Sequence, residues 1–164
     1  MQDRGGSVGK SSWVLEAAAA VEGSVAWLEE GLTPDMYTVL VGAVIGAMAG
    51  KMESAILRGS SNFTQLGGLQ FDRDVRNLIQ LLAPIAPGAP VRERLGRLTQ
   101  AAALISFETV DEVAEFYGGG GSSPSMTEGG TTEKSLWKLA PSELRQVMAL
   151  RVDWLPEDLQ RLKL

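Results

Sequence analysis

The most recognisable chemical motif is Gly9-Lys10-Ser11, near the start of the chain. In a phosphate-binding loop, glycine amides surround the phosphates, a lysine neutralises their charge and a hydroxyl binds magnesium. The complete motif needs another glycine five positions before Gly9, where this chain has Arg4, and it needs a preceding strand. We therefore interpret residues 1–11 as a flexible N-terminal tail. A small nucleotide-binding protein that uses this degenerate loop remains an alternative.

A second candidate site is the acidic cluster of Glu108, Asp111, Glu112 and Glu115, expected on one helix. Paired carboxylates can transfer protons or hold a hard cation. Helical spacing places Asp111, Glu112 and Glu115 opposite the apolar side of that helix, so a solvated face is the simpler interpretation. The same face could dock a basic surface of a partner, and metal binding or catalysis is the remaining alternative.

The chain contains neither histidine nor cysteine. The usual zinc, iron–sulfur and haem sites, disulfides, cysteine nucleophiles and Ser–His–Asp triads therefore cannot be built. The net charge of −5 and the pI near 4.8 argue against duplex nucleic acid or an anionic membrane surface as the main partner. We expect a cytosolic binding or assembly protein, not an enzyme, with no cofactor and no bound metal.

Apolar residues recur at helical spacing along most of the chain, and no segment shows the alternation of a β-strand. Proline and glycine clusters divide the expected helices, which cover residues 12–31, 34–58, 70–82, 91–105, 107–117, 141–152 and 156–164. Thr33 and Ser106 are expected to cap two of them, and residues 59–68 are expected to form a loop. We predict an all-α fold, an antiparallel bundle of about six to seven helices. Residues 12–164 would form one domain with a Gly/Ser-rich loop at 118–134.

Residues 36–50 form a nearly unbroken apolar run in which Gly42, Gly46 and Gly50 recur every fourth position. This spacing is typical of helices that pack closely in lipid. The run has about 15 residues, however, and a bilayer-spanning helix needs ~20. We predict a core helix buried on several sides. A short membrane-associated helical protein is the alternative.

Residues 62–74 (NFTQLGGLQFDRD) resemble a run in the C-terminal region of subunit 4 of the conserved oligomeric Golgi (COG) complex. The similarity continues in order through residues 97–100, 107–117, 137–146 and 149–153, and then to the end of the chain. Residues 1–61 match only loosely. Family members are several times longer, so we expect the C-terminal piece of a larger subunit or a truncated gene model.

The resemblance implies a non-catalytic subunit of a Golgi vesicle tether, built as part of a helical rod. Such a protein would act in intra-Golgi retrograde transport and Golgi organisation, at the cytosolic face of the Golgi membrane, as a peripheral rather than an integral membrane protein. The implied partners are other COG complex subunits, SNAREs and Golgi trafficking factors. Two departures stand out: residues 118–134 are longer than the family's loop, and Ala140 replaces a frequent capping threonine worth ~1 kcal/mol.

One arginine and one glutamate stand out as a structural pair. Arg92, Arg94 and Arg97 crowd the start of an expected helix, where the helix dipole disfavours cations. Arg97 is nearest the apolar side and would need an acidic partner, for which Glu143 is the candidate. The resemblance adds that family members carry an arginine and a glutamate at these positions, which are thought to tie two helices together. We therefore predict a salt bridge between Arg97 and Glu143.

Overall fold

The computed structural model describes residues 11–59, 62–118 and 138–161. In these ranges the protein is all-α, as predicted, and contains no strand. The elements in chain order are α1 (Ser12–Val25), η1 (Ala26–Leu28, a 3₁₀ turn), α2 (Pro34–Leu57), α3 (Gln65–Leu82), α4 (Val91–Arg94), α5 (Gly96–Ser106), α6 (Val110–Gly118), α7 (Pro141–Met148) and α8 (Pro156–Arg161).

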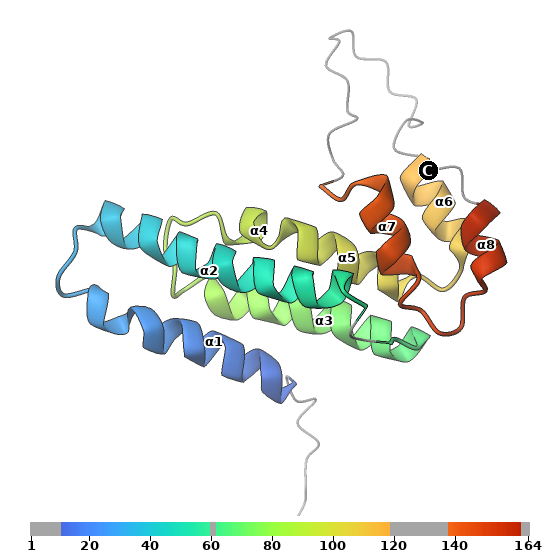
Figure 1. Ribbon diagram of the computed structural model, residues 1–164. Coiled ribbons are helices and arrows are strands. Elements are labelled where there is room, and N and C mark those ends of the chain that lie inside the picture. The colour runs from blue at the N-terminus through green and yellow to red at the C-terminus, as the bar shows by residue number, and fades with distance from the viewer. Residues whose placement is uncertain (1–10, 60–61, 119–137, 162–164) are drawn as a thin grey trace, which may run out of the picture.

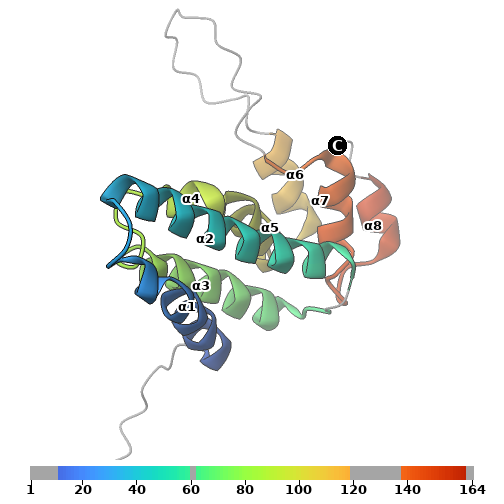
Figure 2. The same cartoon turned by 60° about the vertical axis from the view of Figure 1, so that its left-hand side comes forward.

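Helices α1, α2, α3 and α5 run lengthwise beside one another, and each runs opposite to the one before it in this order (Figure 1). In this group α3 packs against both α1 and α5, and α2 packs against α4 and α5. The three short helices α6, α7 and α8 gather at one end, where α7 contacts α5 and α2 (Figures 1 and 2). The arrangement is a helical bundle with a short helical group attached at one end.

The start of α2 follows its sequence signals. The Thr33 hydroxyl accepts a hydrogen bond from the Met36 N–H at 3.4 Å, Pro34 occupies the first turn, and Asp35 lies near the positive end of the helix dipole. The expected loop at residues 59–68 is wrong from Gln65 onwards, because α3 begins there. The Thr64 hydroxyl accepts from the Gly67 N–H at 3.2 Å and caps α3.

Glycine at position 68 lets α3 and α5 approach each other closely. A Cβ atom on Gly68 would lie 2.2 Å from the Ile105 carbonyl oxygen. No other side chain fits this helix crossing without moving one of the helices.

Several other predicted helix boundaries are wrong. The first helix ends at Val25, before a 3₁₀ turn, and the expected helix at 91–105 is divided at Leu95. Leu95 has φ −93° and ψ 5°, and it precedes Gly96, a weak helix former. Ser106 does not cap the next helix: its hydroxyl donates to the Ala103 carbonyl, and α6 begins only at Val110.

The helix expected at 141–152 ends at Met148, and α8 is described as far as Arg161.

The core lies between the long helices and extends to α7. The helical spacing of five apolar residues in the range 91–105 predicts one inward face, and all five are buried: Val91, Leu95, Leu98, Ala102 and Ile105. The prediction that residues 36–50 are buried on several sides is wrong. One face of α2 is buried through Val41, Ile45 and Ala49, while its opposite face is open to solvent.

Candidate functional site

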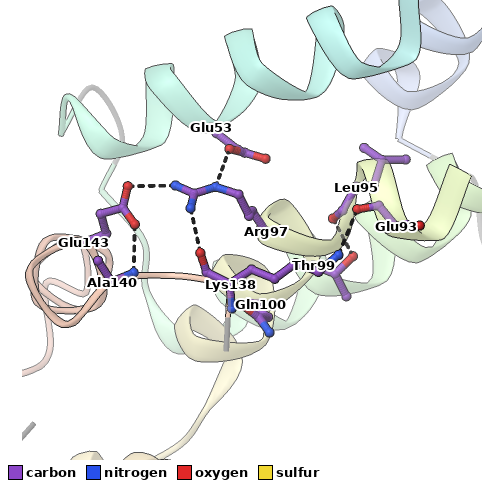
Figure 3. A network of polar contacts seen from close by, with 9 residues as sticks. All are labelled: Glu53, Glu93, Leu95, Arg97, Thr99, Gln100, Lys138, Ala140 and Glu143. Carbon is purple, nitrogen blue, oxygen red and sulfur yellow. Dashed lines mark hydrogen bonds and ion pairs between the residues drawn. The ribbon is translucent and has the colours of Figure 1, made fainter. Parts of the chain in front are cut away.

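Arg97 lies in the first turn of α5 and contacts three separate parts of the chain (Figure 3). Its Nη2 donates to Glu143 Oε1 of α7 at 2.7 Å, and its Nε donates to Glu53 Oε2 of α2 at 3.0 Å. Its Nη1 donates to the Lys138 carbonyl at 2.6 Å. The structure thus brings together the two residues that were singled out as a pair, and adds α2 and the segment before α7 to the same guanidinium.

Glu143 uses both oxygens of its carboxylate. Oε1 faces Arg97, and Oε2 accepts from the Ala140 N–H at 2.8 Å at the start of α7. The bond from Ala140, followed by the one from Arg97, holds the pKa of Glu143 below its usual value. Hydrogen bonds to Glu143 and then to Glu53 raise the pKa of Arg97. Ala140 has no side-chain oxygen, so Glu143 supplies the capping interaction from within the helix.

The sequence interpretation missed Glu53 as the other carboxylate of this cluster. Its side chain is 16% exposed, against 34% for Arg97 and 27% for Glu143. A signal was present, because Glu53 lies on the inward side of α2 near Ala49 and Ile56, and an acid at such a position needs a cation. The cavity beside the cluster is ≈ 10 Å³, which leaves no room for a small-molecule ligand.

Lys138 connects the segment before α7 to α4 and α5. Its backbone N–H donates to Gln100 Oε1 at 2.8 Å, and its Nζ donates to the Glu93 carbonyl at 3.1 Å (Figure 3). With the bond from Arg97 to its carbonyl, all three polar groups of Lys138 are used. The cluster of Arg97, Glu53, Glu143 and Lys138, which we call the arginine cluster, therefore holds α7 against α2 and α5.

The acidic residues lie on α6 and directly before it, in the short helical group. Asp111, Glu112 and Glu115 are exposed on α6, whereas Glu108 precedes that helix, contrary to expectation. Glu112 Oε2 accepts from the Glu108 N–H at 3.0 Å, and the Glu112 N–H donates to the Thr109 hydroxyl at 3.3 Å. Glu112 thus takes part in the start of its own helix. In the described ranges no three acidic side chains converge as metal ligands do.

Arg151 forms a second arginine centre, although its helical spacing with Leu144, Val147 and Met148 predicts only that it stacks with these apolar residues. Arg151 is 2% exposed, and its Nη1 donates to the carbonyls of Ile105 and Phe107 at 2.7 and 2.5 Å. Nε and Nη2 form a bidentate pair with Asp153 at 2.8 and 2.6 Å. The guanidinium lies 4.5 Å from the centre of the Trp154 ring. Arg151 therefore joins the segment after α7 to the end of α5.

The Gly9-Lys10-Ser11 motif is only partly visible. Gly9 and Lys10 lie outside the described residues, and Ser11 Oγ accepts from Gln70 Nε2 at 3.3 Å. One helix in the described ranges, Pro34–Leu57, is long and apolar enough to cross a membrane, with a mean hydropathy of 1.5. That helix carries Glu53 of the arginine cluster and contacts α4, α5 and α7. Crossing a membrane would require it to leave these contacts.

A family model described as "Conserved oligomeric Golgi complex subunit 4, C-terminal" matches residues 2–146. This chain belongs to that family. The predicted family relationship is therefore confirmed, and it includes α1 and α2, where the motif resemblance was loose. Arg97, Glu53 and Glu143 all lie inside the matched range.

Proteins named "Conserved oligomeric Golgi complex subunit 4" from Bos taurus, Homo sapiens and Arabidopsis thaliana are each 34% identical to this chain over 152 residues. The match covers 93% of this chain but 18% of the cattle and human proteins and 19% of the plant protein. The chain therefore spans about a fifth of the length of these relatives of the COG subunit 4 family.

Proposed function

We propose that this chain is a non-catalytic part of a COG complex subunit, acting in vesicle tethering during intra-Golgi retrograde transport and in Golgi organisation. The single observation that carries the proposal is the family match over residues 2–146. The chain would associate with the cytosolic face of the Golgi membrane through proteins, as a peripheral component.

The arginine cluster would serve this function by fixing the position of the short helices. Arg97 bonds to α2, to α7 and to the segment before α7, so one side chain fixes the angle between the long helices and α7. Surfaces on either side of that junction can then present a constant shape to partners. We assign Arg97, Glu53 and Glu143 a structural role on this basis.

The acidic face of α6 is a candidate contact for a basic partner surface. Asp111, Glu112 and Glu115 are exposed there, and Phe116 beside them is 56% exposed. Charged groups of this kind steer association and select partners more than they supply affinity. Other COG subunits, SNAREs and trafficking factors are the proposed class of partner.

The test is expression of the tagged full chain in cells, followed by purification under mild conditions and by imaging. We expect other COG subunits to copurify with the wild-type chain and the tag to colocalise with a Golgi marker. Arg97→Trp should reduce copurification, whereas Arg94→Trp, an equal substitution at an exposed position, should not. Recovery of no COG subunit together with a diffuse tag signal would reject the proposal.

A further inference from the structure

The outer face of α2 is an unusually apolar helix surface open to solvent. Residues at helical spacing share this face, and we call them the α2 stripe: Met36, Val39, Leu40, Ala43, Ala47, Gly50, Lys51, Ser54 and Arg58, the last being the residue directly after the helix. All of them are exposed except Ser54, which is half-buried. Val39 is 72% exposed and Met36 is 59% exposed. Figure 1 shows α2 in front of α3 and α5, and the exposure of Met36 and Val39 places the stripe on the side of α2 that these helices do not cover. Exposed contiguous apolar patches of this kind mark interaction sites.

The second half of the stripe is lined by small side chains and is open to solvent. Ala47, Gly50, Ser54 and Ala55 line this surface, with Lys51 and Arg58 beside them. A Cβ on Gly50 would meet no atom within 4 Å. Small residues let the axis of a second helix come close, because interhelical distance depends on the side chains at the contact.

The charges on the stripe specify the occupant further. Its charged residues are Lys51 and Arg58, both near the C-terminal end of α2, and neither forms a salt bridge within the ranges that the structure describes. A helix lying antiparallel to α2 would place its first turns beside these cations. The helix dipole favours acidic residues in a first turn. Acids at the start of the partner helix would therefore both stabilise that helix and pair with Lys51 and Arg58.

We propose that the α2 stripe binds an amphipathic α-helix of a partner protein, antiparallel to α2, with acidic residues in its first turns and apolar residues opposite Met36, Val39 and Ala43. This inference deepens the proposed function and rests on it for the existence of partners. Residues 1–10 and 119–137 are poor candidates for the occupant, since their sequences lack the apolar repeat of an amphipathic helix.

Two other occupants fit the stripe less well. A second copy would pair α2 with α2 about a two-fold axis, which would place Lys51 and Arg58 opposite apolar residues, because the stripe contains no acid. A lipid surface favours large apolar side chains, whereas four of the nine stripe residues are alanine, glycine or serine. A partner helix matches both the small residues and the uncompensated cations.

The test uses two fluorescent synthetic peptides of about 20 residues, a length of ~30 Å as a helix. Both have apolar residues at helical spacing; one carries glutamates in its first turns and lysines in its last, and the other has the reverse order. Fluorescence anisotropy measures their binding to the full chain at low ionic strength. We expect tighter binding of the peptide that begins with glutamates. Val39→Asp should weaken it about tenfold or more, because a buried valine would be lost.

The matched control is Leu66→Asp, which places the same charge at a 76% exposed leucine on α3. Its binding should equal that of the wild type. Lys51→Glu with Arg58→Glu should reverse the preference between the two peptides. Equal binding by Val39→Asp and the wild type would overturn the inference.

Two further outcomes would also overturn it. The first is a wild-type chain that forms dimers which Val39→Asp dissociates. The second is binding to vesicles of neutral phospholipid that Val39→Asp abolishes, with no binding of either peptide. The peptides are synthetic and the assay contains no other COG subunit. Peptide binding can therefore fail while copurification with COG subunits succeeds, and copurification can fail while peptide binding succeeds.

Discussion

Replacing Arg97 by tryptophan tests the arginine cluster most directly. The substitution removes the guanidinium that bonds to Glu53, Glu143 and the Lys138 carbonyl, and it leaves two partly buried carboxylates without a cation. Arg94→Trp is the matched control, because Arg94 is exposed on the neighbouring α4 and forms no salt bridge within the described ranges. Both variants add an indole ring near the start of α5, but only Arg97→Trp removes the cluster.

The magnitude follows from the burial of the three side chains. Breaking a fully buried ion pair costs about 3–5 kcal/mol, and breaking an exposed one costs under about 1 kcal/mol. The side chains of Arg97, Glu143 and Glu53 are 34%, 27% and 16% exposed, so solvent screens part of the interaction. We expect Arg97→Trp to lower the free energy of unfolding by about 2–3 kcal/mol. For a chain of this size that corresponds to a fall in Tm of about 5–10 °C.

The assay is thermal unfolding of the full chain, followed by far-ultraviolet circular dichroism. Arg94→Trp should change the unfolding free energy by less than about 0.5 kcal/mol. A double-mutant cycle with Arg97→Met and Glu143→Gln separates the pairwise energy from lost packing. Arg97→Lys should restore only part of the loss, since lysine lacks the planar fork that reaches three acceptors. Equal melting temperatures for the two tryptophan variants would refute the reasoning.

Three further predictions use the same unfolding assay. Arg151→Met should lower the free energy of unfolding by about 3–5 kcal/mol, more than Asp153→Ala, because it leaves the Ile105 and Phe107 carbonyls unpaired. A melting temperature equal to that of the wild type would contradict this. Gly68→Ala should strongly destabilise the chain through its clash with the Ile105 carbonyl, whereas Gly23→Ala, with no atom within 4 Å, should stabilise α1 by about 0.5–1 kcal/mol. Similar effects of the two alanines would argue against the close helix crossing. Because the pKa of Glu143 is lower in the folded state than its ordinary 4.5, the contribution of Glu143 is complete above that pH and is lost as pH falls through the folded value. Glu143→Gln should therefore make the free energy of unfolding less dependent on pH in the acid range. An unchanged dependence on pH would count against a stabilising role for the Glu143 carboxylate.

The helices themselves were predictable from local chemistry. Thr33-Pro34-Asp35 marked the start of α2, and the apolar spacing from Val91 to Ile105 identified the buried face of α4 and α5. Boundaries failed where two local signals competed within a few residues of each other. Ser106 has the chemistry of a cap, but its hydroxyl bonds to Ala103 and α6 starts after Thr109. Thr64 caps α3 inside a stretch whose glycines indicate a loop.

The arginine cluster was only partly predictable, because its members come from distant parts of the chain. Crowded cations at a helix start indicated that Arg97 needed an acid, but sequence alone could not show that Glu53 would also reach it, from 44 residues away. Arg151 was harder still. Its spacing matched an apolar stripe, and only the fold shows that two carbonyls, a carboxylate and an indole ring surround its guanidinium.

By itself the sequence determined the helical class, the chemistry that a chain without histidine and cysteine cannot perform, and the family to which the chain belongs. Each of these depends on composition or on contacts between near neighbours along the chain. Tertiary structure decided which side of α2 is covered and which polar groups meet. Those outcomes depend on how helices distant in sequence pack together, and helical spacing cannot show whether an apolar face is buried or, as along Met36 to Ala47, left open to solvent.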